Sequence, residues 1–111
     1  MSNVSNFYEA TTKKFDVTIM YNGSAPDITG DVVKFIVKED KDNVDGDAII
    51  DVDANVVNNG ATGVAEFALS ISETGVTPKK YYYDIIWTWS TGEVYVLESD
   101  SVTVLERVKD I

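Results

Sequence analysis

The chain has 111 residues, and its 9 Lys and Arg against 19 Asp and Glu give a formal net charge of −10. This length fits one domain, and a hydrophobic fraction of 44% is typical of a packed globule. Nucleic acid and anionic membrane surfaces are not expected partners, because both are bound through clustered cations. We predict one soluble domain over residues 1–111, in which residues 1–6 are polar and flexible.

Two residue types that carry much of protein chemistry, Cys and His, do not occur in the sequence. Their absence excludes disulfides, thiolate and imidazole metal ligands, and an ordinary Ser–His pair. The sequence contains no glycine-rich phosphate loop. Some pairs among the 19 acidic side chains must lie close by chance, so a pair of carboxylates does not indicate a glycosidase. We therefore expect no enzymatic activity and no cofactor.

The first predicted strands alternate apolar and polar residues with a period of two, which is typical of half-buried strands. A short strand is predicted around residues 7–10, and a longer one covers residues 15–21. The dipeptide Asn22-Gly23 predicts a turn after it.

The middle of the chain continues the same pattern. Residues 31–38 form the next predicted strand, and its outward parity is partly apolar because it contains Val32 and Ile36. A charged loop follows at residues 39–46, and residues 47–54 alternate again.

The second half contains the longest alternating runs. We predict a strand over residues 65–71 with Ile71 facing inward, a connection at residues 72–78, and a strand over residues 81–89. A tight hairpin leads to a strand at residues 93–98, and a separate last strand begins near Val102 and ends near Val108.

Seven or eight evenly spaced strands without an amphipathic helix predict a sandwich or a barrel. The segment Glu73-Thr74-Gly75, with Pro78 ahead of a Tyr-rich strand, resembles the corner at which immunoglobulin-like folds cross between sheets. At such a corner a Tyr hydroxyl bonds to upstream backbone, and Tyr81 or Tyr83 fits this role. We therefore predict an all-β, immunoglobulin-like sandwich with 7–8 antiparallel strands in two sheets.

The charged loop is a weak candidate for a calcium site. Its four carboxylates supply the hard oxygen ligands that Ca²⁺ takes, but their spacing does not match an EF-hand loop. The alternative is a solvated loop whose charge prevents pairing of sheet edges. The four residues are Asp40, Asp42, Asp45 and Asp47.

The aromatic residues separate into expected core and expected surface. Four of them share one parity of a predicted strand, and we expect them to pack in the core: Tyr81, Tyr83, Trp87 and Trp89. The alternative is a sugar-binding platform, which would require these rings to be exposed and coplanar. Tyr82 and Tyr95 have parities that point outward, and together with Val32 and Ile36 they are the predicted interface residues.

Three stretches carry a resemblance to a known family: APDITG at 25–30, followed by VKF at 33–35; SETGVTPKKYYYDI at 72–85; and GEVYVLES at 92–99, closing with VTV at 102–104. Their order and spacing resemble the immunoglobulin-like N-terminal domain of tailed-phage baseplate upper proteins and related small phage virion domains. The resemblance covers roughly residues 15–108. The family often has Pro-Gly before its Tyr-rich strand, where this chain has Pro78-Lys79.

The resemblance implies a non-catalytic structural or adaptor protein of a bacteriophage virion, located in the tail or baseplate or as a decoration of the capsid. Its expected partners are other virion proteins, and a homo-oligomer or a lattice position on the particle is expected, after assembly in the cytoplasm of the bacterial host. We see no signal peptide, and the end of the sequence at Ile111 favours an adaptor or decoration role over a receptor-carrying one. The alternatives are a carbohydrate-binding or adhesive module and a repeat of a secreted bacterial adhesin.

Overall fold

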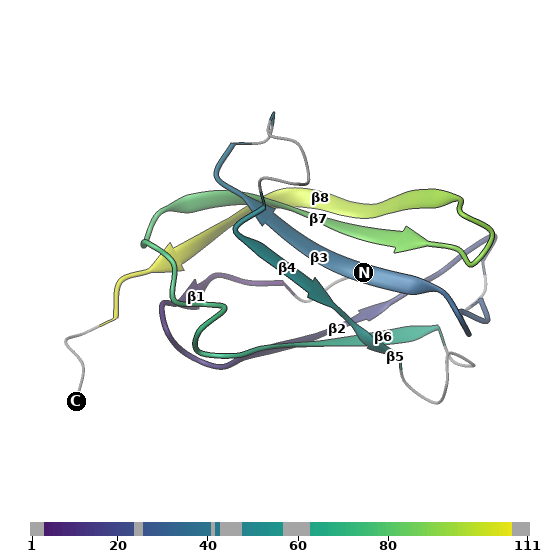
Figure 1. Cartoon of the computed structure of the whole chain (residues 1–111), viewed down its shortest axis with the longest axis horizontal. Coiled ribbons are helices and arrows are strands. Elements are labelled where there is room, and N and C mark those ends of the chain that lie inside the picture. The colour runs from purple at the N-terminus through teal and green to yellow at the C-terminus, as the bar shows by residue number, and fades with distance from the viewer. Residues whose placement is uncertain (1–3, 24–25, 41, 43–47, 57–62, 108–111) are drawn as a thin grey trace.

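The protein is described here by a computed structural model that covers residues 4–23, 26–40, 42, 48–56 and 63–107 (Figure 1). The described residues form eight strands and no helix. The strands are β1 (Phe7–Tyr8), β2 (Lys13–Thr18), β3 (Val32–Lys38), β4 (Ile50–Asp53), β5 (Asn55–Val56), β6 (Val64–Leu69), β7 (Lys80–Thr88) and β8 (Val94–Leu105).

The strands form two sheets. One has the order β1-β8-β7-β3-β4 and the other has the order β2-β6-β5. All pairs are antiparallel except β1 with β8, which is parallel and departs from the predicted all-antiparallel arrangement. A sheet of β2-β6-β5 facing β8-β7-β3-β4 is the arrangement of an immunoglobulin-like sandwich, so the predicted fold class is confirmed.

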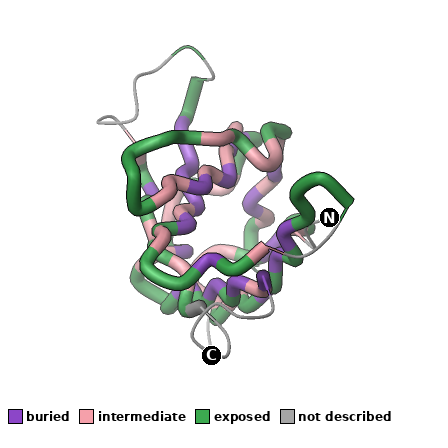
Figure 2. Tube along the Cα trace, turned by 90° about the vertical axis from the view of Figure 1, so that its right-hand side faces the viewer, coloured by how far each residue is buried: buried purple, intermediate pink, exposed green. Residues whose placement is uncertain are grey.

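The core lies between the two sheets and is made by alternate residues of their strands. Buried positions alternate with exposed or half-buried ones along β2, β6 and β7 (Figure 2). Phe15 and Phe67 stack with ring centroids 5.0 Å apart, and Phe35 meets Phe15 edge-on at 5.0 Å from the opposite sheet. These three rings join the sheets through large apolar areas and the edge-to-face geometry that aromatic pairs prefer.

The corner between β6 and β7 is held by two buried side chains. The Tyr81 hydroxyl donates to the carbonyl of Thr77, which confirms the predicted corner and assigns it to Tyr81. Thr74 is fully buried, and its Oγ1 donates to the carbonyl of Thr11 at 2.6 Å while accepting from the Thr11 N–H at 2.9 Å. The corner therefore also anchors the segment between β1 and β2.

Of three local predictions from the sequence, the structure confirms one turn and corrects the position of Ile71 and the division of the last strand. The turn at Asn22-Gly23 is confirmed, because both residues have positive φ, at 53° and 85°. Ile71 was expected inside but is 61% exposed, since β6 ends at Leu69 before the corner begins. The two strands predicted near residues 93–98 and 102–108 are one strand, β8, which carries a bulge opposite Ile85 and Ile86.

Candidate functional site

The candidate site lies on the outer face of the five-stranded sheet, which points away from the core. On this face the register places Val32 beside Thr88 and Thr88 beside Val94, and the next row contains Ile86 beside Val96. These rows form what we call the apolar strip, composed of Val32, Ile86, Thr88, Val94 and Val96. It crosses three paired strands, so the sheet holds its residues in fixed relative positions.

The apolar strip is open to solvent. Val94 and Val96 are each 60% exposed and Val32 is 41% exposed, whereas Ile86 and Thr88 are half-buried. Single exposed apolar residues are common on soluble proteins, but a contiguous group on one rigid face is typical of a contact surface.

Ile36 was predicted as an exposed interface residue, and in this respect the prediction is wrong. It lies on the outer face, but it is only 3% exposed. Ile36 is on the central strand β3, where it has a cross-strand neighbour on each side, Asp84 on β7 and Asp51 on β4. The stems of the long side chains at Lys34 and Lys38 flank it along the same face, and such stems cover apolar surface while their charged ends reach water.

Charges border the apolar strip on the β4 side. Lys34 Nζ lies 3.3 Å from Asp51 Oδ1 and 3.4 Å from Asp53 Oδ1. The hydrogen bond to Asp51 is the main cause of a raised pKa at Lys34. The three groups are largely exposed, so we assign them to the rim of the face and expect little contribution to stability.

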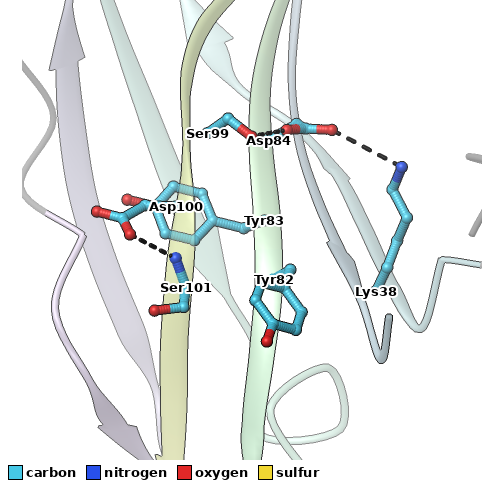
Figure 3. Close-up of a pocket in the computed structure, with 7 residues that line it drawn as sticks. All are labelled: Lys38, Tyr82, Tyr83, Asp84, Ser99, Asp100 and Ser101. Carbon is cyan, nitrogen blue, oxygen red and sulfur yellow. Dashed lines mark hydrogen bonds and ion pairs between the residues drawn. The ribbon is translucent and has the colours of Figure 1, made fainter. Parts of the chain in front are cut away.

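A hollow of about 280 Å³ adjoins the apolar strip. We call it the polar hollow. It lies across β3, β7 and β8 and is lined by Lys38, Tyr82, Tyr83, Asp84, Ser99, Asp100 and Ser101 (Figure 3).

An ion pair with a hydroxyl partner lies at one side of the polar hollow. Asp84 Oδ1 accepts a hydrogen bond from Ser99 Oγ at 2.6 Å, and its Oδ2 lies 3.7 Å from Lys38 Nζ (Figure 3). The Lys38 side chain is 9% exposed and that of Asp84 is 24% exposed. Burial of one charge beside the opposite one avoids the cost of an isolated buried ion.

The two predicted interface tyrosines lie in different places on the sheet. Tyr82 is half-buried beside the polar hollow, and Lys80 Nζ lies 5.7 Å from the centroid of its ring. Tyr95 is also half-buried, but its ring packs 5.0 Å from that of Trp89 and its hydroxyl donates to Glu93. That hydrogen bond is the main cause of a raised pKa at Tyr95. The contact role of both residues stays a prediction.

The aromatic side chains gather at one end of the sandwich instead of forming a platform. The ring planes of Trp87 and Trp89 make an angle of 55°, and those of Trp89 and Tyr95 make an angle of 39°. Tyr21 meets Trp87 and Trp89 edge-on, at 80° and 78°. Trp87 is buried as expected for the core, and no coplanar surface for a sugar is formed by these rings.

Asp31 holds this aromatic end together. Its Oδ2 accepts a hydrogen bond from Trp87 Nε1 at 2.9 Å, and its Oδ1 accepts one from the backbone N–H of Ser90 at 2.9 Å. A second hollow of about 350 Å³ lies beside these groups. Because both carboxylate oxygens of Asp31 accept hydrogen bonds from groups of the same chain, we assign this residue a structural role.

The calcium candidates are only partly described. Asp40 and Asp42 are exposed, and Asp40 Oδ1 accepts a hydrogen bond from the Asp42 N–H at 3.1 Å. Asp45 and Asp47 lie outside the described residues. Within the described ranges, no group of three carboxylates is placed to hold a metal ion, and no helix is long and apolar enough to cross a membrane.

Sequence reasoning missed the residues that build the polar hollow, apart from Tyr82. Lys38, Asp84 and Ser99 come from three strands, and each is unremarkable in its own stretch of sequence. Only the register of β3 on β7 and of β7 on β8 brings them together. The alternation of each strand indicates which way a side chain points, but it does not indicate which residue lies opposite.

Comparisons with known proteins identify no family. No protein-family model matches the chain, and no curated protein sequence matches it. Among solved structures, the chain is similar to the crystal structure of AggA, the major subunit of aggregative adherence fimbriae type I from Escherichia coli. The identity is 14%, the match covers 96% of this chain and 92% of that chain, and the TM-score is 0.37. A likeness at this level carries no statement about function.

Proposed function

We propose that the chain is a non-catalytic structural or adaptor protein that docks through the apolar strip onto another protein. The observation that carries this proposal is the exposure of Val32, Val94 and Val96 on one rigid sheet face. Removing such a group from water on contact is the main favourable term in protein association.

The charge of the chain indicates what kind of surface the partner presents. The net charge of −10 repels acidic surfaces and attracts basic ones. Glu93 is exposed next to the strip, and Asp51 and Asp53 lie at its β4 side. We therefore propose a partner whose contact surface is apolar at the centre and basic at the rim.

The setting that we propose for this contact is a bacteriophage particle. This part of the proposal is supported by the resemblance of residues 25–30, 72–85 and 92–99 to small phage virion domains. It fits a role that depends on protein contacts, since the chain contains no Cys and no His to supply thiolate or imidazole ligands.

The experiment compares incorporation of two variants into particles. Val96→Asp places a charge in the strip, whereas Ile71→Asp places the same charge at a residue of equal exposure, 61% against 60%, away from this face. Complementation of a phage that lacks the chain, followed by mass spectrometry of purified particles, is expected to show loss of the Val96 variant and retention of the Ile71 variant. Equal retention of both variants would contradict docking through the apolar strip. Absence of the unaltered chain from particles would contradict a role in the virion.

A further inference from the structure

The polar hollow has a lining that selects among ligand classes. A buried cation, Lys38, lies 3.7 Å from a half-buried anion, Asp84, so the two charges offset each other within the hollow. A second carboxylate, Asp100, also lines the hollow, so an anionic ligand would approach two carboxylates in a chain that already carries a net charge of −10. The electrostatics therefore disfavour an anionic ligand.

The lining also offers both donors and acceptors of hydrogen bonds. Among the described residues, no protein group donates a hydrogen bond to Asp84 Oδ2, and the hydroxyls of Tyr82 and Ser101 have no protein partner. The carboxylate oxygen only accepts, whereas each hydroxyl both donates and accepts. A ligand that matches this set carries several groups that donate and accept in turn, which is the property of a polyhydroxylated compound.

The volume of the polar hollow and the ring of Tyr82 further limit the class of ligand. A volume of about 280 Å³ is just below the usual range for ligand sites, so the hollow has room for no more than one small ring. Tyr82 lies at the hollow, and a Tyr side chain combines apolar area with a polar tip (Figure 3). We propose that the polar hollow binds one neutral sugar ring, as a unit of a glycan, through Tyr82, Asp84 and Ser101. This proposal does not depend on docking through the apolar strip.

The experiment follows backbone amides of the ¹⁵N-labelled full chain during titration with sugars that share one ring but differ in charge. The neutral probes are methyl glucoside, methyl galactoside, methyl mannoside and N-acetylglucosamine, and the charged ones are glucuronic acid and glucosamine. At least one neutral probe is expected to shift amides of residues 82–84 and 99–101, with about millimolar affinity, since an open hollow surrounds only part of a small ring. The anionic probe, glucuronic acid, is expected to bind more weakly than methyl glucoside.

Two conservative variants test the contacts. Ser101→Ala and Tyr82→Phe each remove one hydroxyl, and each is expected to weaken binding about fivefold, as loss of one hydrogen bond does. Thr12→Ala removes an exposed hydroxyl elsewhere and is expected to bind normally. The amide spectrum of each variant shows directly that it is folded.

Three results would overturn this proposal: no shift with any neutral sugar, shifts at the aromatic end instead of the hollow, or unchanged affinity in both hollow variants. The proposals of docking and of sugar binding can be tested independently. Val96→Asp is expected to bind sugar normally, and Ser101→Ala is expected to be incorporated into particles normally.

Discussion

The hydroxyl of Thr74 is predicted to be among the most important single polar groups for stability. The residue is fully buried, and its Oγ1 makes two short hydrogen bonds to the backbone of Thr11, a residue 63 positions earlier in the chain. Thr74→Val keeps the shape of the side chain and removes both bonds. Because Val and Thr have nearly the same shape, the change tests the hydrogen bonds more than the packing.

The expected cost follows from the two bonds and from their surroundings. Each hydrogen bond contributes about 1 kcal/mol net, and a partner left buried and unsatisfied costs more. Thr11 is only half-buried, so water reaches its freed N–H and carbonyl in part. We expect a loss of about 2 kcal/mol in the free energy of unfolding. For a domain of this size the melting temperature should fall by about 8 °C.

Urea unfolding followed by circular dichroism measures this loss, with a shifted midpoint and an unchanged slope indicating a change in stability alone. Thr74→Ser is the matched control, because it keeps the hydroxyl and removes one methyl group, at a cost of about 1 kcal/mol. A Val variant as stable as the unaltered chain, together with a less stable Ser variant, would refute the reasoning and assign Thr74 a packing role.

Two further predictions concern the aromatic end and alkaline pH. Asp31→Ala leaves the indole N–H of buried Trp87 without its acceptor and should lower the free energy of unfolding by about 2 kcal/mol, with a change in Trp fluorescence; an unaffected urea midpoint would contradict this. Burial raises the pKa of Tyr81, and the hydrogen bond to Asp51 raises that of Lys34, so both groups favour the protonated folded state. The stability that these two groups contribute is complete below their ordinary pKa values, about 10, and is lost as the pH rises through the raised pKa values. Tyr81→Phe removes one of the two groups, so its urea midpoint should fall less steeply with pH in the alkaline range. An equally steep fall in the variant would contradict a raised pKa at Tyr81.

The fold was largely predictable because its signals are local. The period of two in β2, β6 and β7 appears in the sequence itself, and the corner before Tyr81 has turn residues at fixed offsets. The continuity of β8 was missed because Ser99-Asp100-Ser101 has the composition of a turn. In the structure these residues pair with β7, and the bulge in β8 opposite Ile85 and Ile86 shifts the alternation between the two halves of β8.

The candidate site was predictable only in part, because it depends on contacts between strands. The outward parity of Val32 and Ile36 was correct, yet Ile36 is buried, since a central strand has neighbours on both sides and Val32 lies at the start of its strand. The pairing of Lys38 with Asp84 spans 46 positions of the chain and follows from the register of β3 on β7, which no local pattern specifies.

Docking through the apolar strip is tested most directly by electron cryo-microscopy of the phage particle that we propose as the setting of this chain, at a resolution that places its two sheets. We expect the outer face of β3, β7 and β8, with Val32, Val94 and Val96, to lie against a neighbouring protein that presents basic side chains at the rim of the contact. A particle in which this face points to solvent, while the chain is held through the β2-β6-β5 sheet or the corner at Thr74, would contradict it.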